Sequence, residues 1–469
     1  MSTARPSTAR ATDREILRLT VPALLALVAE PLFLLGDAVV VGRLGTPELA
    51  GVGVAAVVLQ SVVGLCIFLA YGTTAGVARR LGADDLRGAV ALGVDGAWLA
   101  TLIGAAVTAA GVLASSWLVG LFDVSAEVEQ HAVDYLRLSF LGTAPLLVVL
   151  AVTGVLRGLQ DTRTPLRVAV VGNAANLALN VLLVHGLGWG VAGAAVGTVL
   201  AQLGMAGWLL AVLVRAARRH GSPLRPDATG VARAARTGVP LVVRTLTLRA
   251  AIVLTAYAVA SATIDPGTAT GTAAGPDPGA RLAAEEAARI ATHQLAMTIW
   301  TFLAFVLDAI AIAAQALTGR SLGAGDRDGT RRLTRRMTWW GLWAGVVTGL
   351  GLAALSPLLG PLFTADPRVH ELLVPVLLVA ACFQPVAGVV FVLDGVLIGA
   401  GDGRYLAWAG VVVLVAYAPL LLLVGGADLV VVWAVFGAGF IGSRALVLLL
   451  RARGGRWMVT GADVGPGQA

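Results

Sequence analysis

The chain has 469 residues, of which 58% are hydrophobic and 13% are charged, and its formal net charge is +7. Soluble domains contain about 45–50% apolar and about 25% charged residues, so this composition excludes an ordinary soluble protein. Apolar runs of about 20 residues recur along the chain, and each is long enough to cross a bilayer core of roughly 30 Å. The sequence therefore predicts an all-α integral membrane protein that lies in the lipid bilayer.

The apolar runs predict about twelve transmembrane helices. Most arginines follow the even-numbered helices or precede the first one, and the chain contains no lysine. The positive-inside rule then places both termini in the cytoplasm, so the positive charge reflects topology and predicts no nucleic-acid partner. In chain order, the predicted helices cover residues 15–41, 49–73, 88–119, 132–156, 165–185, 190–214, 238–262, 289–318, 337–362, 372–400, 406–424 and 429–450.

The two halves of the chain repeat the same short motifs at one fixed spacing. LGADD at 81–85 returns 241 residues later as LGAGD at 322–326, and GVLRG at 154–158 returns as GVLIG at 395–399. A repeat of six helices brings the chain back to the side of the membrane where it began, so the two repeats should be parallel to each other. The predicted organisation is an N-lobe (1–219), a cytoplasmic linker (220–237), a C-lobe (238–456) with a flexible outer loop (about 262–286), and a C-terminal tail (457–469).

Longer motifs resemble the multidrug and toxic compound extrusion (MATE) family. They are EPLFLLGDAVVVGRLGTPELAGVG at 30–53 and TGVLRGLQDTRTP at 153–165, while DAIAIAAQALTGRSLGAGD at 308–326 and LDGVLIGAGD at 393–402 resemble the DinF-like branch. The resemblance implies two six-helix lobes around a central cleft and alternating access. It also implies export of organic compounds, cationic or lipophilic, in exchange for H⁺ or Na⁺, and we place the protein in the bacterial cytoplasmic membrane.

Polar residues inside two predicted helices of the N-lobe mark a candidate site. Glu30 and Asp37 lie seven residues apart and share one face of the first helix, and Asn173, Asn176 and Asn180 form a similar stripe on the fifth helix. Counted from the outer helix ends, Asp37 lies at the depth of Asn180 and Glu30 at the depth of Asn173. Such groups are costly in lipid and normally face a cavity or a partner, so the two stripes predict a proton or cation site.

The resemblance assigns roles to several of these positions. Asp37 matches the acidic residue at which the family binds its coupling ion, and Asn176, Asn180 and Thr198 match neighbouring cavity positions. Several relatives have a second Asp where this chain has Asn180, so Asp37, together with Glu30, is left as the titrating group. Asp37 would also be the metal ligand if the coupling ion were Na⁺.

Structural alternatives stay open for each of these residues. Asp37 could pair with Arg43 near the helix end, and Glu30 could hydrogen-bond backbone groups freed by Pro31. The asparagines could simply join helices to one another. Pro22 permits a bend of the first helix when Asp37 changes charge, or a static kink set by packing.

A second set of buried charges lies in the C-lobe. Arg244 and Arg249 on the seventh helix, Asp308 on the eighth and Asp394 on the tenth lie at similar depths, and Gln315 extends the face of Asp308. Opposite charges at one depth are expected to pair, because each alone would be costly. The set is either a structural ion-pair network or a substrate or coupling site.

Other functions fit the sequence less well. A phosphate-binding loop needs a lysine, which excludes ATP-driven transport by this chain. The five histidines are scattered without ligand spacing, so an integral membrane enzyme is a remote alternative and no cofactor is expected. The main alternative is a flippase for a lipid or a lipid-linked precursor. We predict a monomer that transports a small organic molecule.

Overall fold

The computed structural model describes residues 9–261, 278–424 and 426–462, and within these it is built of helices joined by short turns. The side chain of Glu30 and residues 262–277 of the predicted outer loop lie outside the described part. The first half of the chain forms α1 (Ala9–Gly42), α2 (Thr46–Leu65), α3 (Phe68–Gly82), α4 (Leu86–Gly120), α5 (Ala126–Phe140), α6 (Thr143–Gly158), α7 (Arg163–Val181), the π-helix η1 (Leu182–Gly186) and α8 (Gly190–His220).

The second half follows the same plan with different breaks. Its first helix begins ten residues earlier than predicted, because the Asp227 side chain accepts a hydrogen bond of 3.1 Å from the Thr229 backbone N–H and caps the helix there. The elements are α9 (Ala228–Ala260), α10 (Pro278–Gly323), α11 (Arg327–Phe363), α12 (Pro367–Gly399), α13 (Gly403–Leu423), α14 (Leu429–Val435), the π-helix η2 (Phe436–Gly442) and α15 (Ser443–Arg453).

The helices are long and apolar enough to cross a membrane. Within the described residues, 10 helical segments meet this condition, and α5 with α6 makes an eleventh if their 50° bend lies inside one span. The helix α1, with 34 residues, adds another long element. The predicted all-α membrane fold is therefore confirmed, although the second and fourth predicted helices are each broken in two.

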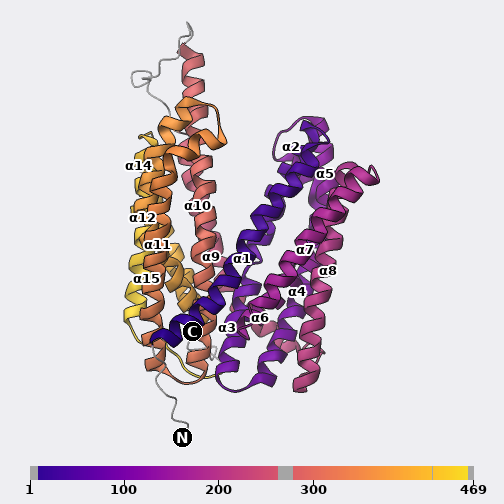
Figure 1. Ribbon diagram of the computed structural model, residues 1–469, viewed down its shortest axis with the longest axis vertical. Helices are drawn as coiled ribbons and strands as arrows, with labels where there is room; N and C mark the ends of the chain where they lie inside the picture. Colours follow the sequence, from indigo (N-terminus) through magenta and orange to yellow (C-terminus); the bar gives the residue numbers. More distant parts are fainter. Residues whose placement is uncertain (1–8, 262–277, 425, 463–469) are drawn as a thin grey trace.

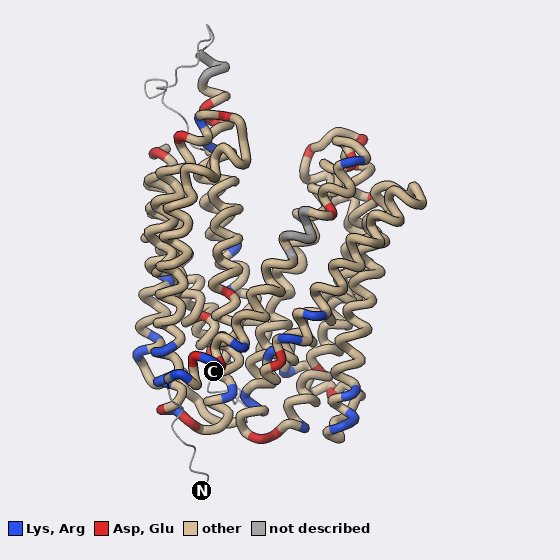
Figure 2. Tube along the Cα trace, in the orientation of Figure 1, with Lys and Arg blue, Asp and Glu red and all other residues tan. Residues whose placement is uncertain are grey.

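The helices gather into two lobes (Figure 1). One lobe contains α2–α8 and the other α9–α15, and each has an apolar core of its own. The lobes meet at the end where the described chain begins and finishes, and they diverge towards the opposite end (Figure 1). Arginines are concentrated at the end where the lobes meet, which we call the arginine-rich end (Figure 2).

The repeated sequence motifs make equivalent packing contacts in the two lobes. A Cβ atom on Gly154 of α6 would lie 2.4 Å from the carbonyl oxygen of Ala70 on α3, and a Cβ on Gly395 of α12 would lie 2.4 Å from that of Ala311 on α10. Both residues of the second contact follow their counterparts by 241 positions. The glycines are needed because α6 on α3, and α12 on α10, pack backbone against backbone.

The LGAxD motifs end in helix caps. Asp85 accepts a hydrogen bond of 2.8 Å from the backbone N–H of Gly88 at the start of α4, and Asp326 accepts one of 2.7 Å from that of Gly329 at the start of α11. A carboxylate at this position satisfies a backbone donor that the helix leaves unpaired. The last residue of each motif therefore has a structural role.

The helix α1 connects the two lobes. Ile16 and Leu19, near its start, belong to the core of the C-lobe, whereas Val40 and Val41, near its end, pack against Val184 in the N-lobe. In Figure 1 it runs diagonally from the arginine-rich end of one lobe to α2 in the other. Any change in the angle between the lobes must therefore move or bend α1.

Candidate functional site

The centre of the N-lobe site is a carboxylate held by two amides. Asn180 donates a hydrogen bond of 2.8 Å from Nδ2 to Oδ1 of Asp37, and Asn176 donates one of 3.1 Å from Nδ2 to Oδ2. Asn176 and Asn180 are buried, while Asp37 is half-buried. The four-residue spacing places both amides on one face of α7, so α7 presents two donors to α1.

Two further residues shape the clamp that Asn176 and Asn180 form on the Asp37 carboxylate. Thr198 of α8 donates a hydrogen bond of 3.2 Å to Oδ1 of Asn176, which orients that amide. Gly197 leaves room for Asn180, because a Cβ at Gly197 would lie 2.1 Å from Asn180 Oδ1. The Asn180 Oδ1 atom is buried and has no hydrogen-bond partner among the described residues. Gly197 gave no signal in the sequence, since a glycine in an apolar helix is common.

The other predicted residues of this site lie around the clamp. Asn173 is half-buried on α7, one turn before Asn176. Within the described part of the chain, no ion pair joins Asp37 to Arg43, which removes the alternative of a helix-end pair. Pro22 lies inside α1, which continues as a helix through it.

The clamp can be compared with what a sodium ion requires. Na⁺ is bound by oxygen atoms, which can come from the Asp37 carboxylate, from amides, hydroxyls and backbone carbonyls, or from water. Here both amides direct nitrogen at Asp37, while their oxygens face Thr198 and Gly197. The arrangement fits an anionic carboxylate whose two oxygens each accept one hydrogen bond.

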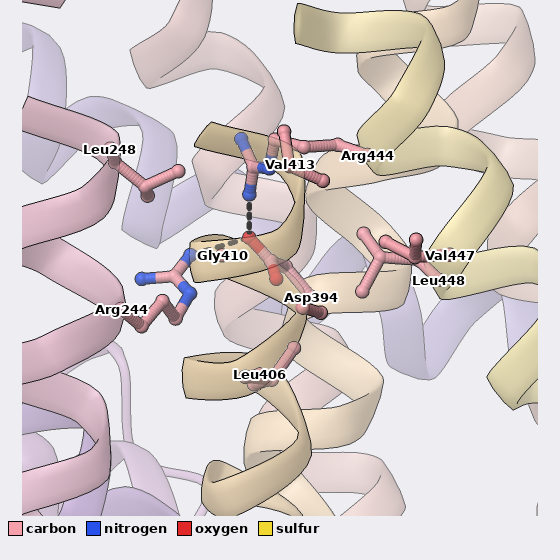
Figure 3. Close-up of a pocket in the computed structure, with 10 residues that line it drawn as sticks. Arg244, Leu248, Asp394, Leu406, Gly410, Val413, Arg444, Val447 and Leu448 are labelled. Carbon is pink, nitrogen blue, oxygen red and sulfur yellow. Dashed lines mark hydrogen bonds and ion pairs between the residues drawn. The ribbon is translucent and has the colours of Figure 1, made fainter. Parts of the chain in front are cut away.

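The C-lobe charges form a buried cluster around Asp394 (Figure 3). Arg244 of α9 donates from Nη2 to Oδ2 of Asp394 at 2.5 Å, and Arg444 of α15 donates to the same oxygen. The side chains of Arg244, Asp394 and Arg444 are only 12%, 7% and 11% exposed. A carboxylate this buried needs a cationic partner, and here it has two.

The sequence-based prediction of the C-lobe network did not include Arg444. It is an arginine inside an apolar helix, and that position by itself was a signal of a buried pair. The guanidinium of Arg244 also lies 5.9 Å from the ring centroid of Tyr71 on α3, so the cluster reaches the N-lobe.

Three other predicted members of the C-lobe network form no ion pair or hydrogen bond with Asp394 among the described residues. Arg249 is exposed and its guanidinium lies against Gly64 of α2, so the expected pairing with an acidic residue is not formed among the described residues. Five residues on a helix turn by about 140°, which places Arg249 on a different face from Arg244. Asp308 is half-buried within electrostatic reach of Arg157 and Arg244, and Gln315 is buried further along α10.

Comparisons with known proteins agree with this architecture. The MatE family model matches residues 22–182 and 283–423. The chain is 30% identical to Protein DETOXIFICATION 44, chloroplastic, of Arabidopsis thaliana, over 96% of this chain and 83% of that protein. It is also 30% identical to a probable multidrug resistance protein NorM of Bradyrhizobium diazoefficiens, over 93% of this chain and 92% of the relative.

Two further likenesses extend the comparison. DNA damage-inducible protein F of Escherichia coli is 29% identical over 68% of this chain and 66% of that protein. The fold superposes with a TM-score of 0.82, at 19% identity, on the MATE transporter VcmN of Vibrio cholerae in its bent form, covering 96% of this chain and 99% of that one.

Two helical lobes built from one repeated plan, with buried polar clusters inside apolar helices, define a multi-pass membrane transporter. The family follows from the sequence match: this chain belongs to the MatE family. It is a transporter of the multidrug efflux type and not an enzyme, which confirms the resemblance seen in the motifs.

Proposed function

We propose that the protein is a secondary antiporter that exports organic compounds, cationic or lipophilic, in exchange for an inward-moving cation, H⁺ or Na⁺. The observation that carries the proposal is the Asp37 carboxylate held by Asn176 and Asn180 between α1 and α7. A carboxylate within a membrane helix is costly to keep and indicates a coupling site.

Protonation of Asp37 would weaken the clamp. A neutral carboxyl accepts hydrogen bonds less strongly than a carboxylate, so the ties from Asn176 and Asn180 to α1 become weaker. The start of α1 stays fixed to the C-lobe, because Asp13 accepts hydrogen bonds of 2.7 Å and 2.5 Å from Arg336 on α11. The end of α1 can then shift relative to the N-lobe, with Pro22 and Pro31 as places to bend.

This movement couples the ion to the substrate. A substrate bound between the lobes from the cytoplasm or the inner leaflet would favour the state in which Asp37 is charged. Binding of the ion from outside would favour the other state and release the substrate outwards. The two ligands must therefore bind with negative coupling, because neither can shift the equilibrium without different affinities for the two states.

We take H⁺ as the coupling ion of this proposal. Both asparagine amides donate to Asp37, and such donors stabilise a carboxylate that a proton would neutralise. We place both termini in the cytoplasm of a bacterial cell, because the arginine-rich end then obeys the positive-inside rule. We propose a monomer that needs no cofactor.

Flux in proteoliposomes tests the proposal. Efflux of a cationic dye would be followed with a pH gradient and a Na⁺ gradient imposed separately, for the wild type and for Asp37→Asn. We expect dye flux to follow the pH gradient and to fall in Asp37→Asn to the level of liposomes without protein. The matched control is Asp134→Asn, which changes an exposed carboxylate on α5 of the same lobe and should leave the flux unchanged.

Each other outcome has a defined meaning. Full flux in folded Asp37→Asn would remove Asp37 from the coupling site. Flux that follows only the Na⁺ gradient would replace H⁺ by Na⁺. The absence of dye flux under either gradient, from well-folded protein, would favour the flippase alternative and a lipid substrate.

A further inference from the structure

The two lobes touch through two equivalent glycine contacts, one contributed by each half of the internal repeat. A Cβ atom on Gly82, at the end of α3, would lie 1.9 Å from the carbonyl oxygen of Arg320 on α10. A Cβ on Gly323, at the end of α10, would lie 1.9 Å from the carbonyl oxygen of Arg79 on α3. Gly323 follows Gly82 by 241 residues, and Arg320 follows Arg79 by the same number. The two contacts are therefore equivalent in the internal repeat.

The side chains of the same two arginines also cross between the lobes. Arg79 donates a hydrogen bond of 3.2 Å from Nη1 to the carbonyl oxygen of Ala400, after α12 in the C-lobe. Arg320 donates one of 2.8 Å from Nη1 to Oε1 of Gln160, after α6 in the N-lobe. The carbonyl of each arginine therefore packs closely against a glycine of the other lobe, and its guanidinium donates a hydrogen bond to a loop of the other lobe.

The two ends of the chain add one partner to each arginine. Arg320 pairs with Glu15 near the start of α1 at 3.2 Å, and Arg79 donates to the carbonyl of Val459 after α15. Arg79 is 2% exposed, whereas the Arg320 side chain is 49% exposed. The contact on the Arg79 side is thus the more strongly buried half of a two-fold arrangement.

We propose that Gly82, Gly323, Arg79 and Arg320 form a latch that holds the lobes together at the arginine-rich end and must separate for the transporter to open there. The inference rests on the alternating access proposed above. The contacts made by these four residues are side-chain hydrogen bonds and close backbone packing, and polar interfaces between domains can part and re-form. Any side chain larger than hydrogen at Gly82 or Gly323 would force the helices apart by about 1 Å or more.

The separation of the lobes can be measured directly. Spin labels would be placed at Arg218→Cys on α8 and Arg332→Cys on α11, which are exposed in different lobes at this end, in a Cys66→Ala, Cys382→Ala background. Pulsed electron double resonance then gives the distance between the lobes without substrate or gradient. We expect a short-distance population in the parent protein, and we expect Gly82→Ala with Gly323→Ala to reduce it relative to longer distances by about tenfold or more, since overpacking is relieved by opening.

The controls separate a latch from a general effect of glycine substitution. Gly204→Ala and Gly351→Ala replace helical glycines whose Cβ would meet no atom within 4 Å, and they should leave the distances unchanged. Arg79→Ala with Arg320→Ala keeps the glycines but removes the crossing hydrogen bonds, and it should also shift the population to longer distances. This pair decides the question if the glycine variant does not fold, as judged by size-exclusion chromatography.

Unchanged distances in the folded variants, or an equal shift in the controls, would overturn the latch. That result would leave the antiporter proposal intact, because the measurement uses no transport. Conversely, full flux in Asp37→Asn would overturn the coupling site and leave the distance result unaffected.

Discussion

Removing one donor from the Asp37 clamp should move the pH dependence of transport. Asn180→Ala deletes the shorter of the two hydrogen bonds, 2.8 Å against 3.1 Å for Asn176. A hydrogen bond is worth about 1.5–3 kcal/mol to a charged group and about 0.5–1.5 kcal/mol to a neutral one. The difference is about 1–1.5 kcal/mol, and 1.4 kcal/mol corresponds to tenfold in affinity, so proton affinity should rise roughly five- to tenfold. The donor stabilises the anion more than the neutral carboxyl, and its loss therefore favours the protonated form.

The readout is the pH midpoint of dye flux. Initial rates would be measured in proteoliposomes over a series of pH values at a constant pH difference across the membrane. We expect the midpoint of Asn180→Ala to lie about 1 pH unit above that of the wild type, and the midpoint of Asn176→Ala to move in the same direction by less. Asp134→Asn, the exposed carboxylate on α5, serves as the unshifted control.

The donor geometry at Asp37 fixes the expected direction of the shift. A midpoint that stays in place in folded Asn180→Ala would show that the amide does not act on the titrating group. A midpoint that falls to lower pH would show that the amide stabilises the protonated form, contrary to the donor geometry at Asp37.

Two further predictions concern stability. Hydrogen bonds from Arg336 hold the pKa of Asp13 below its ordinary value, so the stability that this pair adds is present above about pH 4 and is lost as the pH falls further. Asp13→Asn should remove this acid-sensitive part of the melting curve in detergent, and an unchanged acid profile would contradict the assignment. Asp394→Ala should destabilise the C-lobe by about 3–5 kcal/mol, because it leaves Arg244 and Arg444 buried without their counter-ion. Arg444→Leu should cost less in the same melting assay, and equal losses would show that Arg244 alone does not satisfy the carboxylate.

Helical periodicity explains why part of the candidate site could be predicted. The stripe of Asn173, Asn176 and Asn180 and the depth of Asp37 follow from 3.6 residues per turn and the distance from the helix end. Both are local properties of a helix that must cross the bilayer. The structure then brings Asn176 and Asn180 to Asp37.

The C-lobe cluster shows where the sequence was insufficient. Depth alone placed Arg244, Arg249 and Asp394 together, but pairing also requires helices to face one another. The five-residue spacing on α9 turns Arg249 away from the face of Arg244, and the packing of α15 against α12 brings Arg444 to Asp394. Depth is set by the chain, whereas facing is set by the packing of neighbouring helices.

By itself, the sequence determined the membrane fold, the internal repeat and the family, because hydropathy and motif spacing are written along the chain. Only the tertiary structure decided that α1 joins both lobes and that Gly82 and Gly323 cross at their boundary. The repeat fixed which residues are equivalent. Which of them touch depends on the angle between two lobes, and that angle results from contacts between residues hundreds of positions apart.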